Sequence, residues 1–258
     1  MTGASWARRL ASGAPIGERV AIVVAHPDDE TLWTGSLLPR LRDGLLIHVT
    51  DGAPRDMEDA AALGFVDRDA YREAREAEIV EALERLGADV EHRRYLVPDK
   101  EAALALPALA DRLAGDLRGA AVVITHPYEG GHPDHDACAW AVARACGRLG
   151  GHAPARVEFA CYHLRDGERR FGLFWPGPEE HERRFDVPER ERVAAAIATH
   201  RTQAAVIGGW TPEREMWRAA PEYDFAAPPP PGRALYDGFG WEMTSERFSA
   251  LAREAGAC

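Results

Sequence analysis

Two short clusters of histidine and acidic residues stand out in this sequence because their side chains are of the types that bind metal ions. The first spans positions 26–30 and reads His26-Pro27-Asp28-Asp29-Glu30. The second spans positions 130–136 and reads Gly130-Gly131-His132-Pro133-Asp134-His135-Asp136. Neighbouring carboxylates repel one another unless a positive charge lies among them, and a metal ion bound by imidazole and carboxylate groups supplies that charge. We therefore interpret the clusters as parts of a metal site.

Each cluster follows a run of apolar and β-branched residues that is typical of a buried strand. These runs are residues 20–25 and residues 120–125. In open α/β sheets, ligands bind at the carboxyl ends of the strands, where such runs stop and helices begin. We therefore expect the two clusters to converge in space although about a hundred residues separate them in the sequence.

The residue types at these positions suit a hydrolytic zinc centre. A catalytic zinc ion keeps about three protein ligands and an open position for water, whose pKa then falls to about 7. His26, Asp29 and His135 can form this set, and Asp28 is placed to accept the proton of the attacking water. Because adjacent residues in a turn point in different directions, the residues alone leave open which of the two aspartates is the ligand and which is the base.

Two further residues of the second cluster are candidates for catalytic roles. His132 lies three residues before His135 and can stabilise an oxyanion or protonate a leaving amine. Asp134 can fix the tautomer of His132 or of a ligand histidine, and it can also cap the helix that follows.

Strand and helix patterns alternate along the first 150 residues, which predicts a Rossmann-like α/β fold with a mostly parallel central sheet flanked by helices. The predicted strands are 20–25, 45–50, 91–97 and 120–125, and the predicted helices are 30–42, 69–86, 103–117 and 133–149. A hairpin of strands 157–164 and 169–175 and a helix at 188–201 follow.

We expect a single domain over residues 1–258, with a core at about 18–203 and a C-terminal covering segment at about 204–258. The aromatic content of this last segment is too high for a solvated linker. Its proline run, residues 228–231, cannot form a central strand.

Composition narrows the range of partners. The net charge of −11 disfavours binding to nucleic acid or to an anionic membrane, so we expect a small-molecule partner. No apolar stretch approaches the roughly 18 residues needed to span a bilayer, which predicts a cytoplasmic protein without membrane insertion. The cysteines form no C-x-x-C pair, and Cys138 and Cys146 are expected to pack as small apolar residues on one helix. A homo-oligomer is compatible with the sequence.

The two clusters, taken with Ala25, resemble the signature motifs of the PIG-L or LmbE-like family of zinc-dependent N-acetylglucosaminyl-phosphatidylinositol de-N-acetylases. The helical stretch Arg75-Glu76-Ala77-Glu78, which ends in Leu86-Gly87, is also similar to that family. The resemblance covers at least residues 20–150. It implies a Rossmann-like fold, one Zn²⁺ per chain and removal of an acetyl group from an amino sugar or a related amide.

The resemblance also assigns roles that the residues alone leave open. It implies that His26, Asp29 and His135 are the zinc ligands and that Asp28 is the general base. His132 becomes the residue that stabilises the oxyanion or acts as an acid.

Some members of the family have a tyrosine two residues before the counterpart of His132. Gly130 occupies that position here, and Tyr128 lies further back. The resemblance therefore does not carry a catalytic role over to Tyr128.

Other polar residues near the motifs have simpler structural interpretations. These are Glu30 as a helix-start residue, Arg55 and Arg75 as members of surface ion pairs, His126 as a structural histidine, and His200 and Gln203 as residues at the end of a helix.

The predicted function is therefore a zinc-dependent hydrolase that removes an N-acetyl group from an amino sugar or a sugar-containing small molecule. A mononuclear non-haem iron oxygenase is an alternative, because two histidines and one carboxylate also form its metal site. It would leave Asp29 and His132 without a role. A third hypothesis is a catalytically silent sugar-binding protein. It is disfavoured because every candidate catalytic residue is present. No residue identifies the substrate itself.

Overall fold

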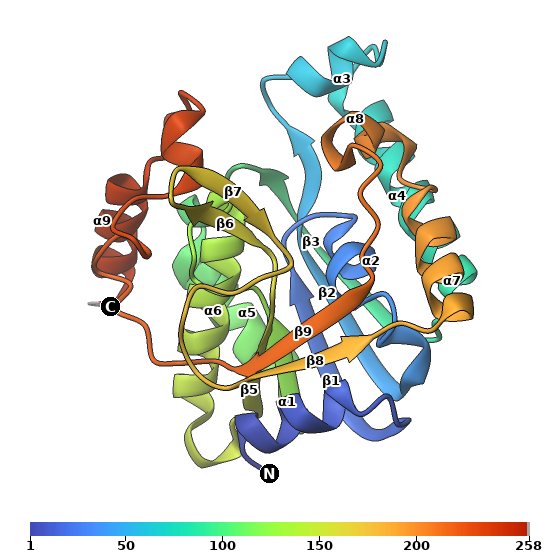
Figure 1. Ribbon diagram of the computed structural model, residues 1–258. Coiled ribbons are helices and arrows are strands. Elements are labelled where there is room, and N and C mark those ends of the chain that lie inside the picture. The colour runs from blue at the N-terminus through green and yellow to red at the C-terminus, as the bar shows by residue number, and fades with distance from the viewer. Residues whose placement is uncertain (257–258) are drawn as a thin grey trace.

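Residues 1–256, the part of the chain that the computed structural model describes, contain a seven-stranded sheet and a separate two-stranded sheet (Figure 1). The strand order in the large sheet is β3-β2-β1-β4-β5-β9-β8. Its strands are β1 (Ile16–Val24), β2 (Leu41–Pro54), β3 (Glu91–Asp99), β4 (Val122–Thr125), β5 (Ala155–Phe159), β8 (Glu180–Arg184) and β9 (Arg214–Ala219). Cys258 lies outside the described residues.

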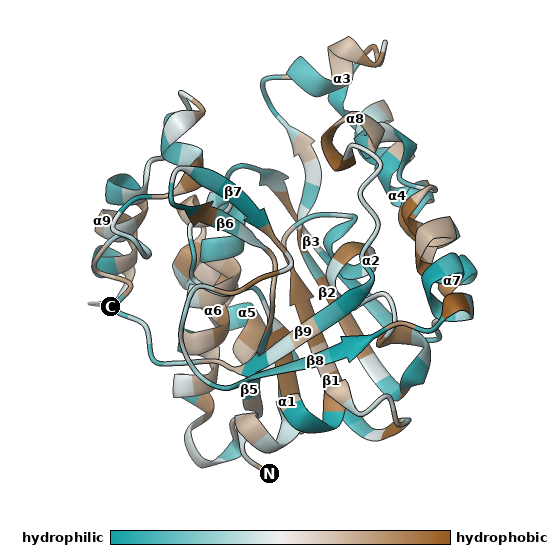
Figure 2. Cartoon of the chain, in the orientation of Figure 1, coloured by the Kyte–Doolittle hydropathy of each residue, from teal (hydrophilic) through white to brown (hydrophobic). Residues whose placement is uncertain are grey.

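The central part of this sheet is parallel. The pairs β3-β2, β2-β1, β1-β4 and β4-β5 all run parallel, whereas β9 pairs antiparallel with β5 and with β8. The prediction of a Rossmann-like α/β fold with a mostly parallel sheet is confirmed. Strands β8 and β9 were not predicted, because their polar sequences lack the apolar pattern of a buried strand; both are drawn as hydrophilic ribbons in Figure 2.

Successive residues of β1 point into two different cores, as the two-residue period of a strand requires. Ala21 and Val23 belong to one core, and Val20, Ile22 and Val24 belong to the other. Both faces of the central strands are thus buried, which explains why their sequence is an unbroken apolar run.

Helices cover both faces of the sheet (Figure 1). One core contains residues of α5 (Leu106–Asp116), α6 (Pro133–Leu149) and α9 (Ser245–Gly256). The other contains residues of α1 (Gly3–Ala11), α2 (Asp29–Thr34), α4 (Arg68–Leu86) and α7 (Val187–Ile197). Two short helices, α3 (Glu58–Ala62) and α8 (Ala204–Ile207), lie near each other beyond the carboxyl edge of the sheet.

The predicted helix 30–42 is too long. Helix α2 ends at Thr34, and a 3-10 turn at Leu38–Arg40 leads directly into β2. Gly35 follows α2, and Pro39 lacks the N–H group that a continuing helix needs there. The early end lets β2 begin at Leu41, several residues before the predicted strand.

The predicted hairpin exists, but its first strand is divided between the two sheets. Strand β5 belongs to the large sheet, whereas β6 (Tyr162–Arg165) and β7 (Glu168–Phe171) pair antiparallel in the small one. The turn between them is at Asp166 and Gly167, both of which have positive φ values. The β6–β7 hairpin projects over the carboxyl edge of the large sheet (Figure 1).

Residues 204–256 contribute to both the sheet and the core. Strand β9 is a member of the large sheet, and Phe248 and Ala252 of α9 are buried against α5 and α6. Residues 228–231 lie outside every strand. The division into a core and a covering segment stays a prediction.

Cys138 and Cys146 lie on α6 as free, buried thiols within a hydrophobic core, so the prediction that they pack as small apolar residues is confirmed.

Among residues 1–256, none of the helices combines the length and the hydropathy needed to cross a membrane.

Candidate metal centre

The two sequence clusters meet at the carboxyl edge of the parallel strands. His26 follows β1, and Asp28 and Asp29 begin α2. His132 and His135 lie at the start of α6, which follows β4. Strands β1 and β4 are hydrogen-bonded neighbours, so the loops at their ends are adjacent as expected.

Three ligand atoms form a nearly equilateral triangle. His26 Nδ1 lies 3.3 Å from Asp29 Oδ2 and 3.3 Å from His135 Nε2, and the third side, from His135 Nε2 to Asp29 Oδ2, is 3.4 Å. A tetrahedral zinc ion with bonds of about 2.0 to 2.1 Å separates its ligand atoms by about 3.3 to 3.4 Å. The three side chains therefore fit a zinc-sized cation without rearrangement.

The second ring nitrogen of His26 faces carboxylates. His26 Nε2 lies 3.3 Å from Asp134 Oδ2 and 3.1 Å from Asp99 Oδ1. Histidine ligands characteristically donate their other N–H group to a carboxylate, which orients the ring and leaves the opposite nitrogen free for the metal. The geometry at His26 has this form.

Asp134 positions His26 rather than His132. Its carboxylate is fully buried and accepts hydrogen bonds from the backbone N–H groups of Lys100 (2.7 Å) and Ala102 (3.0 Å). His132 Nδ1 is further away, at 3.9 Å. Of the two histidines that the sequence offered, Asp134 therefore lies closer to the candidate ligand His26.

The electrostatic field at the site favours a cation. Burial alone would lower the pKa of His26, but Asp99, Asp134 and Asp29 outweigh it and raise that pKa well above its usual value. Although burial opposes its ionisation, Asp29 has a pKa well below the usual value because His135 and His126 lie beside it. An ionised carboxylate at Asp29 is the form that binds metal.

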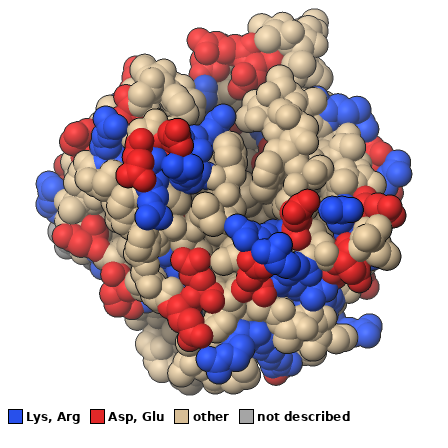
Figure 3. All heavy atoms as spheres, viewed as in Figure 1, with Lys and Arg blue, Asp and Glu red and all other residues tan. Residues whose placement is uncertain are grey.

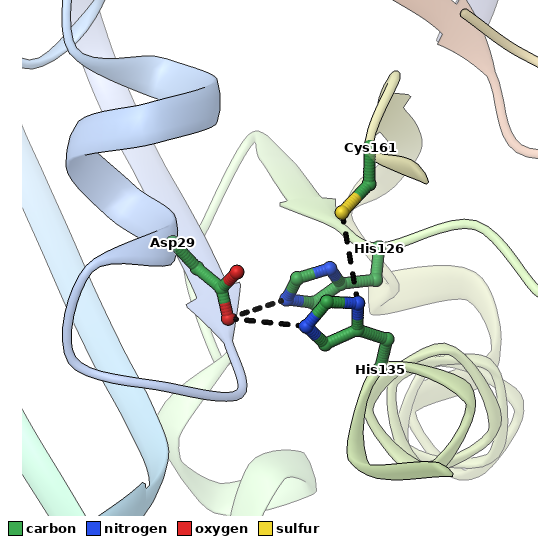
Figure 4. Close-up of side chains that lie close together, drawn as sticks. All are labelled: Asp29, His126, His135 and Cys161. Carbon is green, nitrogen blue, oxygen red and sulfur yellow. Dashed lines mark hydrogen bonds and ion pairs between the residues drawn. The ribbon is translucent and has the colours of Figure 1, made fainter. Parts of the chain in front are cut away.

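His135 is held by a cysteine and a second histidine that the sequence analysis did not place in the site (Figure 4). His135 Nδ1 lies 3.6 Å from Cys161 Sγ, and the rings of His135 and His126 stack with centroids 3.9 Å apart. His126 Nε2 accepts a hydrogen bond from the Ala25 N–H and lies 3.4 Å from Asp29 Oδ2. His126 thus lies within the site, and its structural role stays a prediction.

The ligand-type side chains fall into two groups of four, and within each group the ligand atoms all lie within 4.8 Å of one another. The first is Asp29, His126, His135 and Cys161, and the second is His26, Asp99, His132 and Asp134. The triangle described above connects them, since it draws members from both. The described residues therefore include a cluster able to hold one metal ion.

Asp28 lies beside the triangle and is paired with Arg75. Arg75 Nη2 is 3.1 Å from Asp28 Oδ2 and 3.2 Å from the Pro27 carbonyl oxygen. Burial raises the pKa of Asp28 despite the nearby guanidinium group, which suits a general base. The interpretation of Arg75 as a surface residue is wrong, because its side chain is only 3% exposed.

Gly52 makes room for this arginine. It has a positive φ of 65°, and a Cβ atom there would lie 2.6 Å from the guanidinium carbon of Arg75. A side chain at position 52 would therefore displace Arg75 from Asp28.

His132 caps the N-terminus of α6. Its Nδ1 atom accepts a hydrogen bond from the Asp134 N–H at 3.2 Å, which leaves the proton of the neutral ring on Nε2. Burial and the positive charge favoured at His26 hold the pKa of His132 well below its usual value. His132 is therefore a neutral donor in this structure.

The loop before His132 is tied to the C-terminal part of the chain. Glu129 accepts a hydrogen bond from Arg218 Nη2 at 2.8 Å, and the Gly130 carbonyl accepts one from the Leu235 N–H at 2.7 Å. The Asp136 carboxylate accepts hydrogen bonds from the Gly130 N–H at 3.1 Å and from the Tyr236 hydroxyl at 2.9 Å. The segment after 204 thus helps to position His132.

A pocket of about 360 Å³ opens from these residues to the surface. Figure 3 shows a hollow on this face between the side that carries the β6–β7 hairpin and the side that carries α3 and α8, with acidic and basic side chains interspersed around it. The side chains that line the pocket include the motif residues His26, Asp28, Asp29, His132 and His135, the polar residues Glu58, Asp59, Arg75, Asp99, Lys100, Arg169 and Gln203, and the apolar residues Leu32, Trp33, Tyr162, Phe171, Val206, Ile207, Trp210, Phe239 and Trp241.

Tyr128 does not line this pocket. Its hydroxyl donates to the Ala227 carbonyl oxygen at 2.8 Å, and its ring contacts Phe225 and Phe248. The structure gives Tyr128 a packing role.

The remaining polar residues have mixed outcomes. Arg55 forms the expected exposed ion pair, with Glu101. Gln203 lines the pocket, whereas His200 is buried behind it, 3.1 Å from Thr31 Oγ1. Glu30 begins α2 as expected, but it is also fully buried and paired with His48, which holds its pKa at about 2 despite burial.

The parallel sheet with helices on both faces and the His-Asp cluster at its carboxyl edge define a Rossmann-like α/β protein with a candidate metal centre. Residues 21–146 match the family model described as PIG-L, GlcNAc-PI de-N-acetylase. The matched region contains the motif residues of both clusters and has the sequence pattern of that family.

A curated relative from Bacillus subtilis, a probable N-acetyl-α-D-glucosaminyl L-malate deacetylase 2, is 30% identical over 138 residues. The match covers 50% of this chain and 60% of the relative.

Solved structures share the fold. The zinc-inhibited form of teicoplanin deacetylase Orf2 has a TM-score of 0.59 at 15% identity, over 78% of this chain and 97% of that one. The A40926 pseudoaglycone deacetylase Dbv21 has a TM-score of 0.59 at 19% identity, over 80% of this chain and 99% of that one. GalB, a 4-carboxy-2-hydroxymuconate hydratase from Pseudomonas putida, has a TM-score of 0.52 at 14% identity, over 80% of this chain and 97% of that one. At such identities the likeness concerns the fold alone.

Proposed function

We propose that this protein is a zinc-dependent N-deacetylase that removes the acetyl group from an amino sugar or a sugar-containing small molecule. The observation that carries the proposal is the triangle of His26 Nδ1, Asp29 Oδ2 and His135 Nε2, with sides of 3.3 to 3.4 Å, at the base of a pocket. Asp28 and His132 line the same pocket. The match of residues 21–146 to the de-N-acetylase family model supports the reaction class.

His26, Asp29 and His135 would hold one zinc ion per chain. When bound there, zinc would polarise the acetamide carbonyl and lower the pKa of a water molecule. Asp134 and Asp99 orient His26, and Cys161 orients His135, through contacts with their other ring nitrogens.

Asp28 is the proposed general base. Its carboxylate accepts one proton as the oxygen of the attacking water bonds to the carbonyl carbon. Burial of Asp28 raises its proton affinity, and Arg75 keeps its carboxylate ionised and in place.

His132 is the proposed donor to the developing oxyanion. Its neutral ring carries the proton on Nε2, and donors of this kind lower a barrier by about 3 kcal/mol. The C–N bond then breaks, and the amine leaves with the proton that Asp28 took from water. The products are acetate and a free amine.

The substrate and the cellular location are further parts of the proposal. The relative from Bacillus subtilis is a probable deacetylase of an N-acetylglucosaminyl malate, which supports an N-acetylated sugar as substrate. Free buried thiols at Cys138, Cys146 and Cys161 suit the reducing cytoplasm.

Acetate release tests the function. Zinc-loaded protein is incubated with a panel of N-acetylated glucosamine derivatives, and acetate and free amine are both measured. We expect equal amounts of the two, loss of turnover with a chelator, and recovery with zinc. Hydration of an unsaturated acid without acetate release would instead favour the reaction of GalB, and oxygen consumption would favour the iron oxygenase.

A further inference from the structure

The pocket beyond the proposed zinc site has an aromatic wall. Trp33 and Trp210 have ring centroids 5.0 Å apart, and Phe171 lies 6.1 Å from Trp210. Tyr162 extends this surface inwards, because its ring centroid is 5.8 Å from that of Phe171 and 5.2 Å from that of His135. The aromatic wall, defined as these four residues, thus runs from a candidate ligand to the mouth of the pocket.

A second aromatic surface lies beside the proposed oxyanion donor. The ring centroid of Trp241 is 5.1 Å from that of His132, and Phe239 packs against Trp241 at 4.9 Å. Both line the same pocket as the aromatic wall. Two aromatic surfaces therefore line the pocket beyond the proposed reaction centre.

Some of these side chains remain exposed. Phe171 is 40% exposed and Phe239 is 45% exposed, although both are large and apolar. Exposed apolar surface around a pocket marks a ligand-binding groove, because covering it with a flat apolar group removes it from water. The pocket volume of about 360 Å³ is at the lower end of the range for small-molecule sites.

Arg169 supplies a cation at the mouth. It lies on β7, and its guanidinium carbon is 4.8 Å from the Phe171 ring centroid. The other basic residues of the pocket already form ion pairs with carboxylates: Lys100 with Asp56 at 2.7 Å, and Arg75 with Asp28. Within residues 1–256, no acidic side chain pairs with Arg169. The acids Glu58 and Asp59 belong to α3, on the far side of the hollow from the hairpin (Figure 1).

We propose that the substrate carries a flat, apolar aglycone that stacks on the aromatic wall, and that this aglycone bears a carboxylate recognised by Arg169. The inference rests on the proposed function, because it places the acetamide at the zinc site. Most of its residues lie beyond position 146, outside the region that the family model matches. The aromatic wall and Arg169 are thus features by which this chain selects its own substrate.

A set of matched substrates tests the inference. Zinc-loaded protein is given the methyl, phenyl, 4-carboxamidophenyl and 4-carboxyphenyl glycosides of N-acetylglucosamine, in both anomeric forms, and kcat/KM is measured for acetate release. We expect phenyl to exceed methyl by about tenfold through stacking. We expect 4-carboxyphenyl to exceed its neutral carboxamide by about threefold to fivefold, an advantage that salt reduces.

Three variants assign these gains to residues. Trp210→Ala should abolish the advantage of phenyl over methyl, and Arg169→Gln should abolish only the advantage of carboxylate over carboxamide. Arg170→Gln is the matched control, because Arg170 lies on the same strand, pairs with Glu168 and does not line the pocket. It should retain both advantages.

Binding of the deacetylated glycosides, followed by tryptophan fluorescence, separates this inference from the proposed function. Equal kcat/KM values and equal affinities across the set would overturn the inference while leaving the deacetylase proposal intact. An Arg169-dependent preference in binding without acetate release from any substrate would overturn the deacetylase proposal and support the aglycone site.

Discussion

Arg75 Nη2 lies 3.1 Å from Asp28 Oδ2, and both side chains are buried. Removing one partner of such a pair leaves an uncompensated charge, which typically costs about 3 to 5 kcal/mol of stability. We therefore expect Arg75→Met to lower the free energy of unfolding by this amount. In a protein that already carries Asp28→Asn, the same change should lower it by at least about 1 kcal/mol less. Urea unfolding of both single variants and the double variant measures the coupling.

Arg85→Met is the control for this cycle. Arg85 lies on the same helix but is exposed, and its pair with Glu81 should contribute less than about 1 kcal/mol. Additive effects of Arg75→Met and Asp28→Asn would show that the two side chains do not interact energetically.

Cys161 should tune metal affinity without being a ligand. Its Sγ atom lies 3.6 Å from His135 Nδ1, on the side of the ring away from the triangle. We expect Cys161→Ala to weaken zinc binding by about 10- to 100-fold, the usual effect of losing the group that orients a ligand. Cys161→Ser, which keeps an acceptor, should lose less. Competition with a chromogenic chelator measures the affinity.

Cys146→Ala is the matched control, because Cys146 is a buried thiol on α6 outside both groups of ligand-type residues. It should bind zinc like the unchanged protein. An unaltered affinity in Cys161→Ala would exclude the orienting role.

Glu215 should make stability depend on pH. It accepts hydrogen bonds from the Ser36 N–H at 2.7 Å and from the Ser36 hydroxyl at 2.6 Å, and burial raises its pKa from 4.5 to about 7. A raised pKa in the folded state means that the contribution to stability is complete below pH 4.5 and is lost as pH rises through 7. The loss is at most about 3 kcal/mol.

Glu215→Gln resembles the protonated form and should remove this dependence. The free energy of unfolding is measured by urea titration at intervals from pH 4.5 to 8, and the difference between variant and unchanged protein is plotted. That difference should grow with pH. Glu213→Gln, which changes an exposed glutamate on the adjoining segment, should give a flat difference. A flat difference for Glu215→Gln as well would rule out the pKa shift.

The sequence predicted the two clusters and their convergence because each consists of neighbouring residues at the end of an apolar strand. Asp99 ends β3 and Cys161 follows β5 at the same edge of the sheet. The same reasoning would have found Asp99, which lies two residues after the predicted strand 91–97. Cys161 offered no such signal, because its position depends on β6 leaving the large sheet. Arg75 did offer a sequence signal. It lies one helical turn before Ile79, which places it on the buried face of α4.

The antiparallel strands β8 and β9 could not be predicted from apolar patterning. No residue of β8 is buried, and the buried residues of β9 include Glu215 and Arg218. These two are stabilised by partners distant in sequence, Ser36 and Glu158 among them. Such pairs become visible only once the fold brings them together.

The most direct test of the account is to measure metal content and acetate release in Asp28→Asn and His135→Ala, with folding checked by circular dichroism. Asp28→Asn should bind one zinc per chain but lose about 1,000-fold in kcat, the scale of a missing general base. His135→Ala should lose the metal and, with it, activity. Full acetate release by zinc-loaded Asp28→Asn, or an unchanged zinc affinity in His135→Ala, would contradict the proposed centre.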